Sequence, residues 1–199
     1  MFKIIVFIVM AFIYINANET KRIENLKQFI GSLSTKNTEQ KLNSVNLYFN
    51  QIVPAYDSFS DVNRDEWDTM IDFVKKGKGD CEEYAISKYE TLKMSGLDEN
   101  KLYLMVVRER TRQNNEFHLV VAYYYESDND PLILDNLSFK VLPLNKRIDL
   151  HPIMIFNEKN SYNVDKLGKK TKIINSEFPF KLTQIKQKLT NQMELYKPF

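Results

Sequence analysis

The rest of the sequence can be placed around one central stretch, Gly77-Lys78-Gly79-Asp80-Cys81-Glu82-Glu83-Tyr84-Ala85. A glycine-rich run ends in Cys81, the only cysteine of the 199-residue protein, and a helical pattern begins there. Helix N-termini present free N–H groups and a partial positive charge, which favour a thiolate over a thiol. The stretch therefore predicts a functional cysteine at the start of a helix.

The composition indicates one ordinary globular domain. The chain is 43% hydrophobic and 27% charged, and Lys plus Arg (28) nearly balances Asp plus Glu (26), for a net charge of +2. Such proportions are typical of a folded domain with a sizeable core. There is no lysine- and arginine-rich cluster with interleaved aromatic residues, which argues against nucleic-acid binding.

The N-terminus has the pattern of a secretory signal peptide. A short positive region, Met1–Lys3, precedes the apolar run Ile4–Ile15, and the small residue Ala17 offers a cleavage point. The run is shorter than the roughly 20 residues that a membrane-spanning helix needs, although an uncleaved N-terminal anchor is the alternative. We expect a signal peptide over residues 1–17, a single domain over 18–199, and a location outside the cytoplasm.

That location restricts the role of Cys81. In an oxidising compartment structural cysteines usually pair, and Cys81 has no partner within the chain. It therefore pairs between molecules, is buried and inert, or is a functional thiol. The context of a helix start favours the functional thiol.

Apolar periodicity predicts helices first and strands afterwards. The expected helices are Glu19–Leu33, a stronger one after Thr38 that Pro54 closes, Asp65–Lys75, Cys81–Ser95 and a final one, Phe180–Tyr196. The expected strands are Leu102–Val107, Phe117–Tyr125, Leu132–Asp135, Phe139–Leu142 and Ile153–Phe156. The polar, lysine-rich segment 157–176 reads as surface loop. Helices followed by an antiparallel meander predict an α+β fold with a core at about 42–156.

The chain has only two histidines, and their positions differ in kind. His118 lies inside an expected strand, whereas His151 lies in a connection before Pro152. A strand histidine is usually a half-buried residue without catalytic function. The next strand, however, ends in Asp135, and a short connecting loop would pair Asp135 near Val120. Asp135 would then lie diagonally beside His118, unless the register slips by one residue.

Together these residues predict a Cys–His–Asp triad. Cys81 would be the nucleophile and His118 the general base, while Asp135 would fix the imidazole tautomer and stabilise its charged form. The Cys81 backbone N–H, with one further donor, would stabilise the oxyanion. Trp67, the only tryptophan, reads as a core residue that also suits a wall of the site.

The residues around the triad also carry a family resemblance. The matching segments are Val45–Gln51, Trp67–Thr69, Gly79–Tyr89, Phe117–Tyr124 and Pro131–Asn136. They resemble the bacterial transglutaminase-like cysteine peptidases, the LapG-like periplasmic proteases. The resemblance implies a papain-like, transglutaminase-type fold and a triad of Cys81, His118 and Asp135. It further implies dependence on Ca²⁺, a large surface adhesin as substrate in biofilm control, and an inner-membrane cyclic-di-GMP receptor of the LapD type as inhibitory partner.

The sequence departs from the family pattern at two places. Asp68-Thr69-Met70 stands where Ala-Thr-Pro is common, and Glu83 stands where Asp is common. The first change affects the cleft wall, and the second affects a metal site.

The acids beside Cys81 have two interpretations. Asp80 and Glu83 have the spacing of an N-terminal capping pair, which needs no metal. Alternatively, Asp80, Glu82 and Glu83 supply oxygen ligands to Ca²⁺. Clustered carboxylates would raise the pKa of the thiol, and a cation would remove that conflict. The residues alone favour capping, and the resemblance favours calcium.

Three functions remain open besides a cysteine endopeptidase. The same triad would serve a transglutaminase-type acyl transferase, because the acyl-enzyme is the same and only the acceptor differs. A non-catalytic binding module is disfavoured by the intact Cys81, His118 and Asp135. A redox thiol is disfavoured because the chain has no resolving cysteine.

Overall fold

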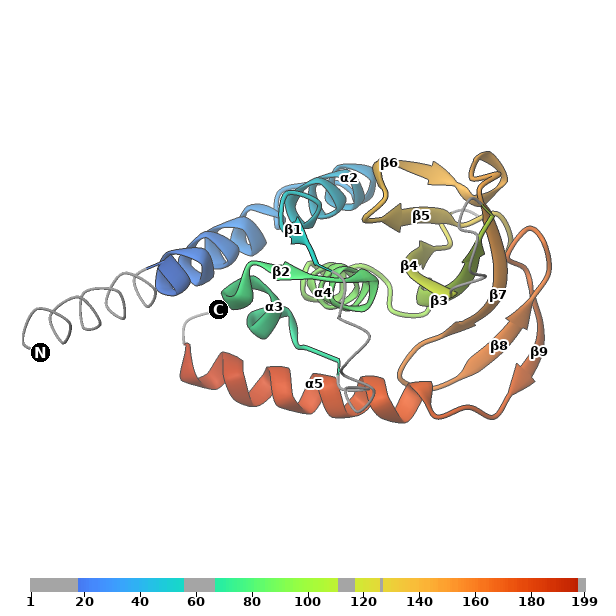
Figure 1. The fold of residues 1–199 in the computed structure, drawn as a ribbon. Helices are drawn as coiled ribbons and strands as arrows, with labels where there is room; N and C mark the ends of the chain where they lie inside the picture. Colours follow the sequence, from blue (N-terminus) through green and yellow to red (C-terminus); the bar gives the residue numbers. More distant parts are fainter. Residues whose placement is uncertain (1–17, 56–66, 111–116, 126, 197–199) are drawn as a thin grey trace, which may run out of the picture.

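The structure is a computed structural model that describes residues 18–55, 67–110, 117–125 and 127–196. The expected signal peptide, residues 1–17, lies outside the described residues. The described chain forms a layer of helices packed against a seven-stranded antiparallel sheet (Figure 1). This arrangement confirms the predicted α+β class. Within these residues, no helix has both the length and the apolar character needed to cross a membrane.

The helices begin at polar caps that the sequence supplies. A first helix covers residues 18–32. It is followed by α2 (Thr38–Phe49), α3 (Met70–Lys76), α4 (Cys81–Met94) and α5 (Phe178–Leu195). The side chains of Asn37, Thr69 and Asp80 accept backbone N–H groups at the starts of α2, α3 and α4. Such capping satisfies N–H groups that would otherwise lack a partner.

The third helix is shorter than the sequence predicts. It starts at Met70, because Thr69 is extended and caps Asp72 N–H at 3.1 Å. Trp67 and Asp68 therefore precede the helix, which leaves the Trp67 ring free to pack elsewhere.

The sheet combines two meanders. Its strands are β3 (Leu102–Glu109), β4 (Phe117–Tyr123), β5 (Leu132–Asp135), β6 (Ser138–Pro143), β7 (Leu150–Phe156), β8 (Ser161–Val164) and β9 (Lys170–Ile174). The spatial order is β6-β5-β4-β3-β7-β8-β9. After β6 the chain returns through a short 3₁₀ helix, Leu144–Lys146, and β7 pairs with the free edge of β3. The five strands predicted from the sequence are all present.

The prediction of a surface loop over residues 157–176 is wrong. The segment contains β8 and β9, which extend the sheet beyond β7. The loop was predicted from the lysine-rich composition, but lysines also suit β9, an edge strand whose side chains are mostly exposed. Charged side chains are usual on edge strands, since they discourage pairing with another chain.

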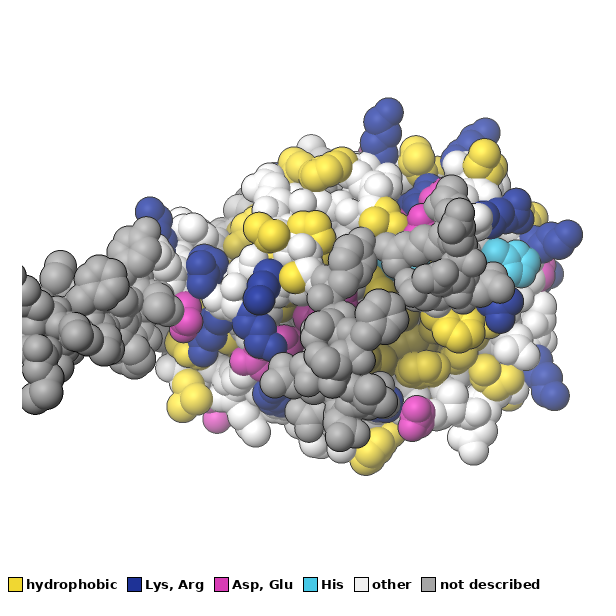
Figure 2. All heavy atoms as spheres, in the orientation of Figure 1, with side chains coloured by type: hydrophobic (Ala, Val, Ile, Leu, Met, Phe, Trp, Pro, Cys, Tyr) yellow, Lys and Arg dark blue, Asp and Glu magenta, His cyan; other side chains and the backbone are white. Residues whose placement is uncertain are grey.

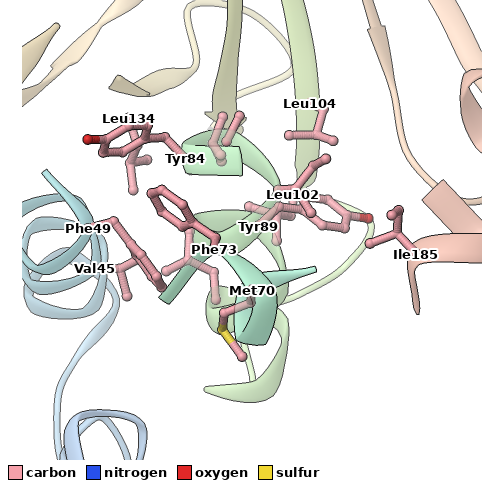
Figure 3. Packing of buried hydrophobic residues seen from close by; sticks show 14 of the residues in the cluster. Val45, Phe49, Met70, Phe73, Tyr84, Tyr89, Leu102, Leu104, Leu134 and Ile185 are labelled. Carbon is pink, nitrogen blue, oxygen red and sulfur yellow. The ribbon is translucent and has the colours of Figure 1, made fainter. Parts of the chain in front are cut away.

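The core is built around α4. This helix lies between the other helices and the sheet, and Tyr84 to Leu92 are buried without a break. Figure 3 shows side chains from α2, α3, α5 and the sheet converging on it. Tyr89 and Phe73 are among the largest fully buried side chains. Because α4 is enclosed on all sides, its N-terminus, with Cys81, is fixed relative to the sheet.

The glycine run before Cys81 is held in place by sequence and packing. Gly77 ends α3 in the left-handed conformation (φ +68°), which glycine adopts at little cost. Lys78–Gly79 then forms β2, which pairs in parallel with β1 (Val53–Pro54). A Cβ on Gly79 would lie 2.7 Å from the Phe73 ring. Only glycine therefore fits where the chain enters α4.

We expect Gly79→Ala to lower the free energy of unfolding by about 1–3 kcal/mol, as overpacking does in a dense core. Thermal unfolding measures the effect. Gly31→Ala is the matched control, because a Cβ there meets nothing within 4 Å and alanine favours a helix by about 1 kcal/mol. Equal melting temperatures for the two variants would contradict this account of the loop.

Candidate active site

Cys81 is the first residue of α4, and the residues beside it form the predicted capping box. The Asp80 side chain accepts Glu82 N–H at 3.4 Å, and Glu83 Oε2 accepts Asp80 N–H at 3.0 Å. Glu83 Oε1 also accepts the N–H of Asp68 at 3.4 Å. The acids thus fix both the helix start and the segment before α3.

The thiol of Cys81 lies among opposing electrostatic influences. Its Sγ donates to Glu82 Oε2 at 2.9 Å. Burial and the negative charge of Glu82 raise the pKa of the Cys81 thiol, whereas the backbone N–H of Leu119 in β4 lowers it. This arrangement favours the protonated thiol over the thiolate.

His118 and Asp135 are brought together by the sheet. The pairing of Val121 with Leu134 puts Asp135 next in register, opposite Val120, as the sequence predicts. His118 Nε2 lies 2.8 Å from Asp135 Oδ1, and both side chains are buried. The other ring nitrogen, Nδ1, is buried and has no hydrogen-bond partner among the described residues. His118 is therefore anchored through one nitrogen and available through the other.

Arg147 completes the environment of Asp135. Its guanidinium NH2 donates to Asp135 Oδ2 and to Asp149 Oδ2, each at 2.6 Å. Burial opposes ionisation, but the hydrogen bond and charge of His118, with Arg147 nearby, hold the pKa of Asp135 well below its usual range. The carboxylate is thus ionised and fixed at both oxygens.

A second layer of polar contacts holds the Asp135 backbone. Asn46 Oδ1 accepts Asp135 N–H at 3.1 Å, and Asn50 Nδ2 donates to the Asp135 carbonyl at 2.8 Å. Asn46 Oδ1 also accepts a hydrogen bond from the fully buried Lys88 of α4 at 2.9 Å. Burial lowers the pKa of Lys88 to about 7, although the charge of Asp135 opposes the shift. Helices α2 and α4 therefore support the position of Asp135.

A mostly apolar cavity of about 330 Å³ opens beside these residues, and we call it the apolar cavity. Its lining comprises Trp67, Glu82, Val106, Phe117, His118, Leu119, Ile153, Met154 and Phe178. Figure 2 shows hydrophobic side chains gathered in a hollow of the surface. The hollow lies to the left of the position that β8 has in Figure 1, which is drawn in the same orientation. The cavity adjoins the thiol, because Glu82 lines it and accepts a hydrogen bond from Cys81 Sγ.

Two of the three predicted calcium ligands meet at the thiol. Oxygen atoms of Asp80 and Glu82 and the Cys81 Sγ all lie within 4.8 Å of one another. Burial raises the pKa of Asp80 to about 6. Burial and contact with Asp80 raise the pKa of Glu83 to about 8, although Glu83 serves the capping box and does not join that cluster. Crowded carboxylates of this kind suit a hard divalent cation, so the donor set fits Ca²⁺.

The remaining histidine, His151, is exposed on β7 and does not line the apolar cavity. The structure brings His118 and Asp135 together, as the sequence predicts, and adds Arg147, which the sequence did not indicate. An arginine in a connecting segment carries no pattern that marks it, and only the fold brings it to Asp135.

With this geometry in place, comparison with known proteins assigns the chain. A family model described as bacterial transglutaminase-like cysteine proteinase matches residues 10–153. The chain belongs to this family. It is therefore a cysteine peptidase with the transglutaminase-like α+β fold. A search of curated proteins finds no match.

Solved structures of a family member agree with the assignment. Calcium-bound LapG of Legionella pneumophila matches with a TM-score of 0.74 and 29% identity, over 86% of this chain and 91% of that chain. EGTA-treated LapG from the same organism matches with the same TM-score and identity, over 86% and 89%. A third LapG structure matches at 0.72 and 30%, over 86% and 88%. Each structural match thus covers most of both chains.

We expect Arg147→Met to lower kcat by about 100-fold, the scale of effect that misplacing a catalytic group by about 1 Å produces. KM should change little, because Arg147 lies behind Asp135 and does not line the apolar cavity. The free energy of unfolding should fall by about 3–5 kcal/mol, since a buried carboxylate loses its partner. The measurements are steady-state cleavage of a peptide and thermal unfolding.

The matched control is Lys146→Met, which removes the same charge from an exposed neighbour. It should leave both quantities near wild type. An Arg147→Met enzyme with wild-type kcat would show that Asp135 does not need Arg147 for its orientation.

Proposed function

We propose that the protein is a periplasmic, calcium-dependent cysteine endopeptidase that cleaves the N-terminal region of a large surface adhesin and so controls biofilm attachment. Cys81, His118 and Asp135 form its catalytic triad. One observation carries the proposal: His118 is anchored through Nε2 to a buried, ionised Asp135, its buried Nδ1 has no hydrogen-bond partner among the described residues, and it lines a cavity together with Glu82, the residue that contacts the Cys81 thiol.

The residues perform hydrolysis in two steps. His118 Nδ1 takes the thiol proton, and Cys81 Sγ attacks the peptide carbonyl carbon, forming a C–S bond. When the C–N bond breaks, His118 gives the proton to the leaving amine. Water then attacks the thioester, passes a proton to His118, and releases the carboxylic acid while the thiol is restored.

Two features of the site assist these steps. Asp135 stabilises the imidazolium that forms on His118, and Arg147 keeps the carboxylate oriented. As the first helical residue, Cys81 offers a backbone N–H that has no partner within the helix, which suits an oxyanion.

Calcium fits the acids beside the thiol. We propose Asp80, Glu82 and Glu83 as its oxygen ligands, with Glu83 also serving the capping box. A bound cation supplies positive charge that offsets the carboxylates around Cys81. With that charge offset, the Cys81 thiol would lose its proton to His118 more readily. The existence of a calcium-bound LapG structure supports this part of the proposal.

The location and partner rest on the sequence and the resemblance. The pattern of residues 1–17 supports export to the periplasm, where mature protein beginning near Asn18 should be recovered. We propose that an inner-membrane cyclic-di-GMP receptor of the LapD type sequesters the enzyme. Addition of the periplasmic domain of such a receptor to a cleavage assay should then inhibit it.

We expect Cys81→Ala to abolish cleavage of the adhesin N-terminal region and His118→Ala to lower it by several orders of magnitude, because both groups act in bond breaking. Gel analysis of the purified region, incubated with enzyme and Ca²⁺, measures the cut. His151→Ala is the control, since that exposed histidine should leave the rate unchanged. Wild-type cleavage by Cys81→Ala would refute the triad.

We expect EGTA to stop cleavage and added Ca²⁺ to restore it. Binding to the folded state also stabilises it, by about 2.7 kcal/mol at a hundredfold excess over Kd. For a chain of this size that corresponds to a rise in Tm of about 5–10 °C.

Glu82→Gln should remove this rise in Tm, and Glu83→Gln should reduce it. Glutamine at position 83 keeps the capping hydrogen bond but removes the charge. A full calcium response in Glu83→Gln would therefore assign Glu83 to the cap alone. Cleavage and Tm that are both insensitive to EGTA would rule out the calcium site.

A further inference from the structure

Most residues that line the apolar cavity have no role in the proposed catalysis. Its polar groups, His118 and Glu82, belong to the site already described. The rest of the lining is apolar and comes from five separate parts of the chain: the segment before α3, strands β3, β4 and β7, and the start of α5. Apolar surface left open beside a nucleophile is usual for a ligand site.

One wall of the cavity is a rigid aromatic stack. The Trp67 ring lies parallel to Phe178, with centroids 6.0 Å apart and planes 1° apart. Phe156 stacks on Phe178 at 4.8 Å and on Trp67 at 6.2 Å. Phe156 is fully buried, which anchors the stack in the core. The wall is therefore formed before any ligand binds, so binding does not have to order it.

The cavity is adjacent to the reacting atoms. Glu82, which lines it, contacts Cys81 Sγ at 2.9 Å, and His118 lines it as well. An extended peptide advances about 3.3 Å per residue. A peptide whose carbonyl is at Sγ therefore has side chains of the nearest one or two residues within reach of the cavity.

We propose that the apolar cavity is a substrate subsite that takes one apolar side chain of the cleaved polypeptide, from a residue within about two positions of the scissile bond. This inference rests on the proposed endopeptidase function. A charged side chain is disfavoured, because most of the lining is aromatic or aliphatic and its two polar groups, Glu82 and His118, already contact Cys81 and Asp135. At about 330 Å³ the cavity admits a whole side chain, since one water in the liquid occupies only about 30 Å³.

Met154 is the residue through which the subsite can be tested. It lies on β7, lines the cavity and is partly exposed. Met154→Gln keeps the length of the side chain but adds an amide to the lining. Met154→Leu keeps the lining apolar and is the matched control.

The experiment uses the calcium-loaded full protein and a peptide cut by wild type. Each of the two positions on either side of the scissile bond is changed in turn to Leu, Ala, Asp or Lys, and kcat/KM is measured. At one position Leu should exceed Asp and Lys by about 10–200-fold, the range for apolar pockets. Met154→Gln should reduce that preference at least several-fold, and Met154→Leu should retain it.

Alkylation of Cys81 by iodoacetamide separates the subsite from the catalytic groups, since so small a reagent does not fill the cavity. Its rate should be the same in wild type and Met154→Gln. Cleavage without an apolar preference at any position, or with one that Met154→Gln leaves intact, would overturn the subsite and leave the endopeptidase standing. If the wild type cuts no peptide or protein, both proposals fall.

Discussion

A buried carboxylate must be paired, and the pairing of Asp135 links most parts of this fold. One oxygen contacts His118 of β4, and the other accepts from Arg147 in the segment after β6. The backbone of Asp135 hydrogen-bonds to the side chains of Asn46, in α2, and Asn50, the residue directly after α2. An unpaired charge at this depth would cost several kcal/mol, so the sheet register, α2 and the return toward β7 are fixed together.

Cys81 is positioned by a different kind of constraint. Helix α4 is enclosed on all sides, so the place of Cys81 follows from hydrophobic packing and not from polar contacts with His118 or Asp135. Gly79 tightens this further, because the Phe73 ring leaves no room for a Cβ where the chain enters the helix. Packing thus places the thiol, and the polar network places the imidazole. His118 lines the apolar cavity directly, and Cys81 adjoins it through Glu82.

The acids around the thiol give the site a resting form. Glu82 accepts a hydrogen bond from Cys81 Sγ, which favours the protonated thiol. Glu83 accepts the backbone N–H of Asp80 and so caps the start of α4. Positive charge added beside these carboxylates would lower the pKa of the thiol. The calcium site proposed above would act in this way without any change in the fold.

The sequence by itself determined the class of fold, the first five strands of the sheet in chain order, Cys81 at a helix start, and the register that puts Asp135 opposite Val120. These are local features, because periodicity, caps and short turns are written in neighbouring residues. Only the tertiary structure decided that Arg147 orients Asp135, that Lys88 and Asn46 lie beneath it, and that Trp67 and Met154 line one cavity. Residues 157–176 contain two strands because the edge of β7 is open to pairing with β8. The lysine-rich sequence of this segment carries no information about that edge. Contacts between distant segments depend on packing, and packing is not encoded in any one stretch of the chain.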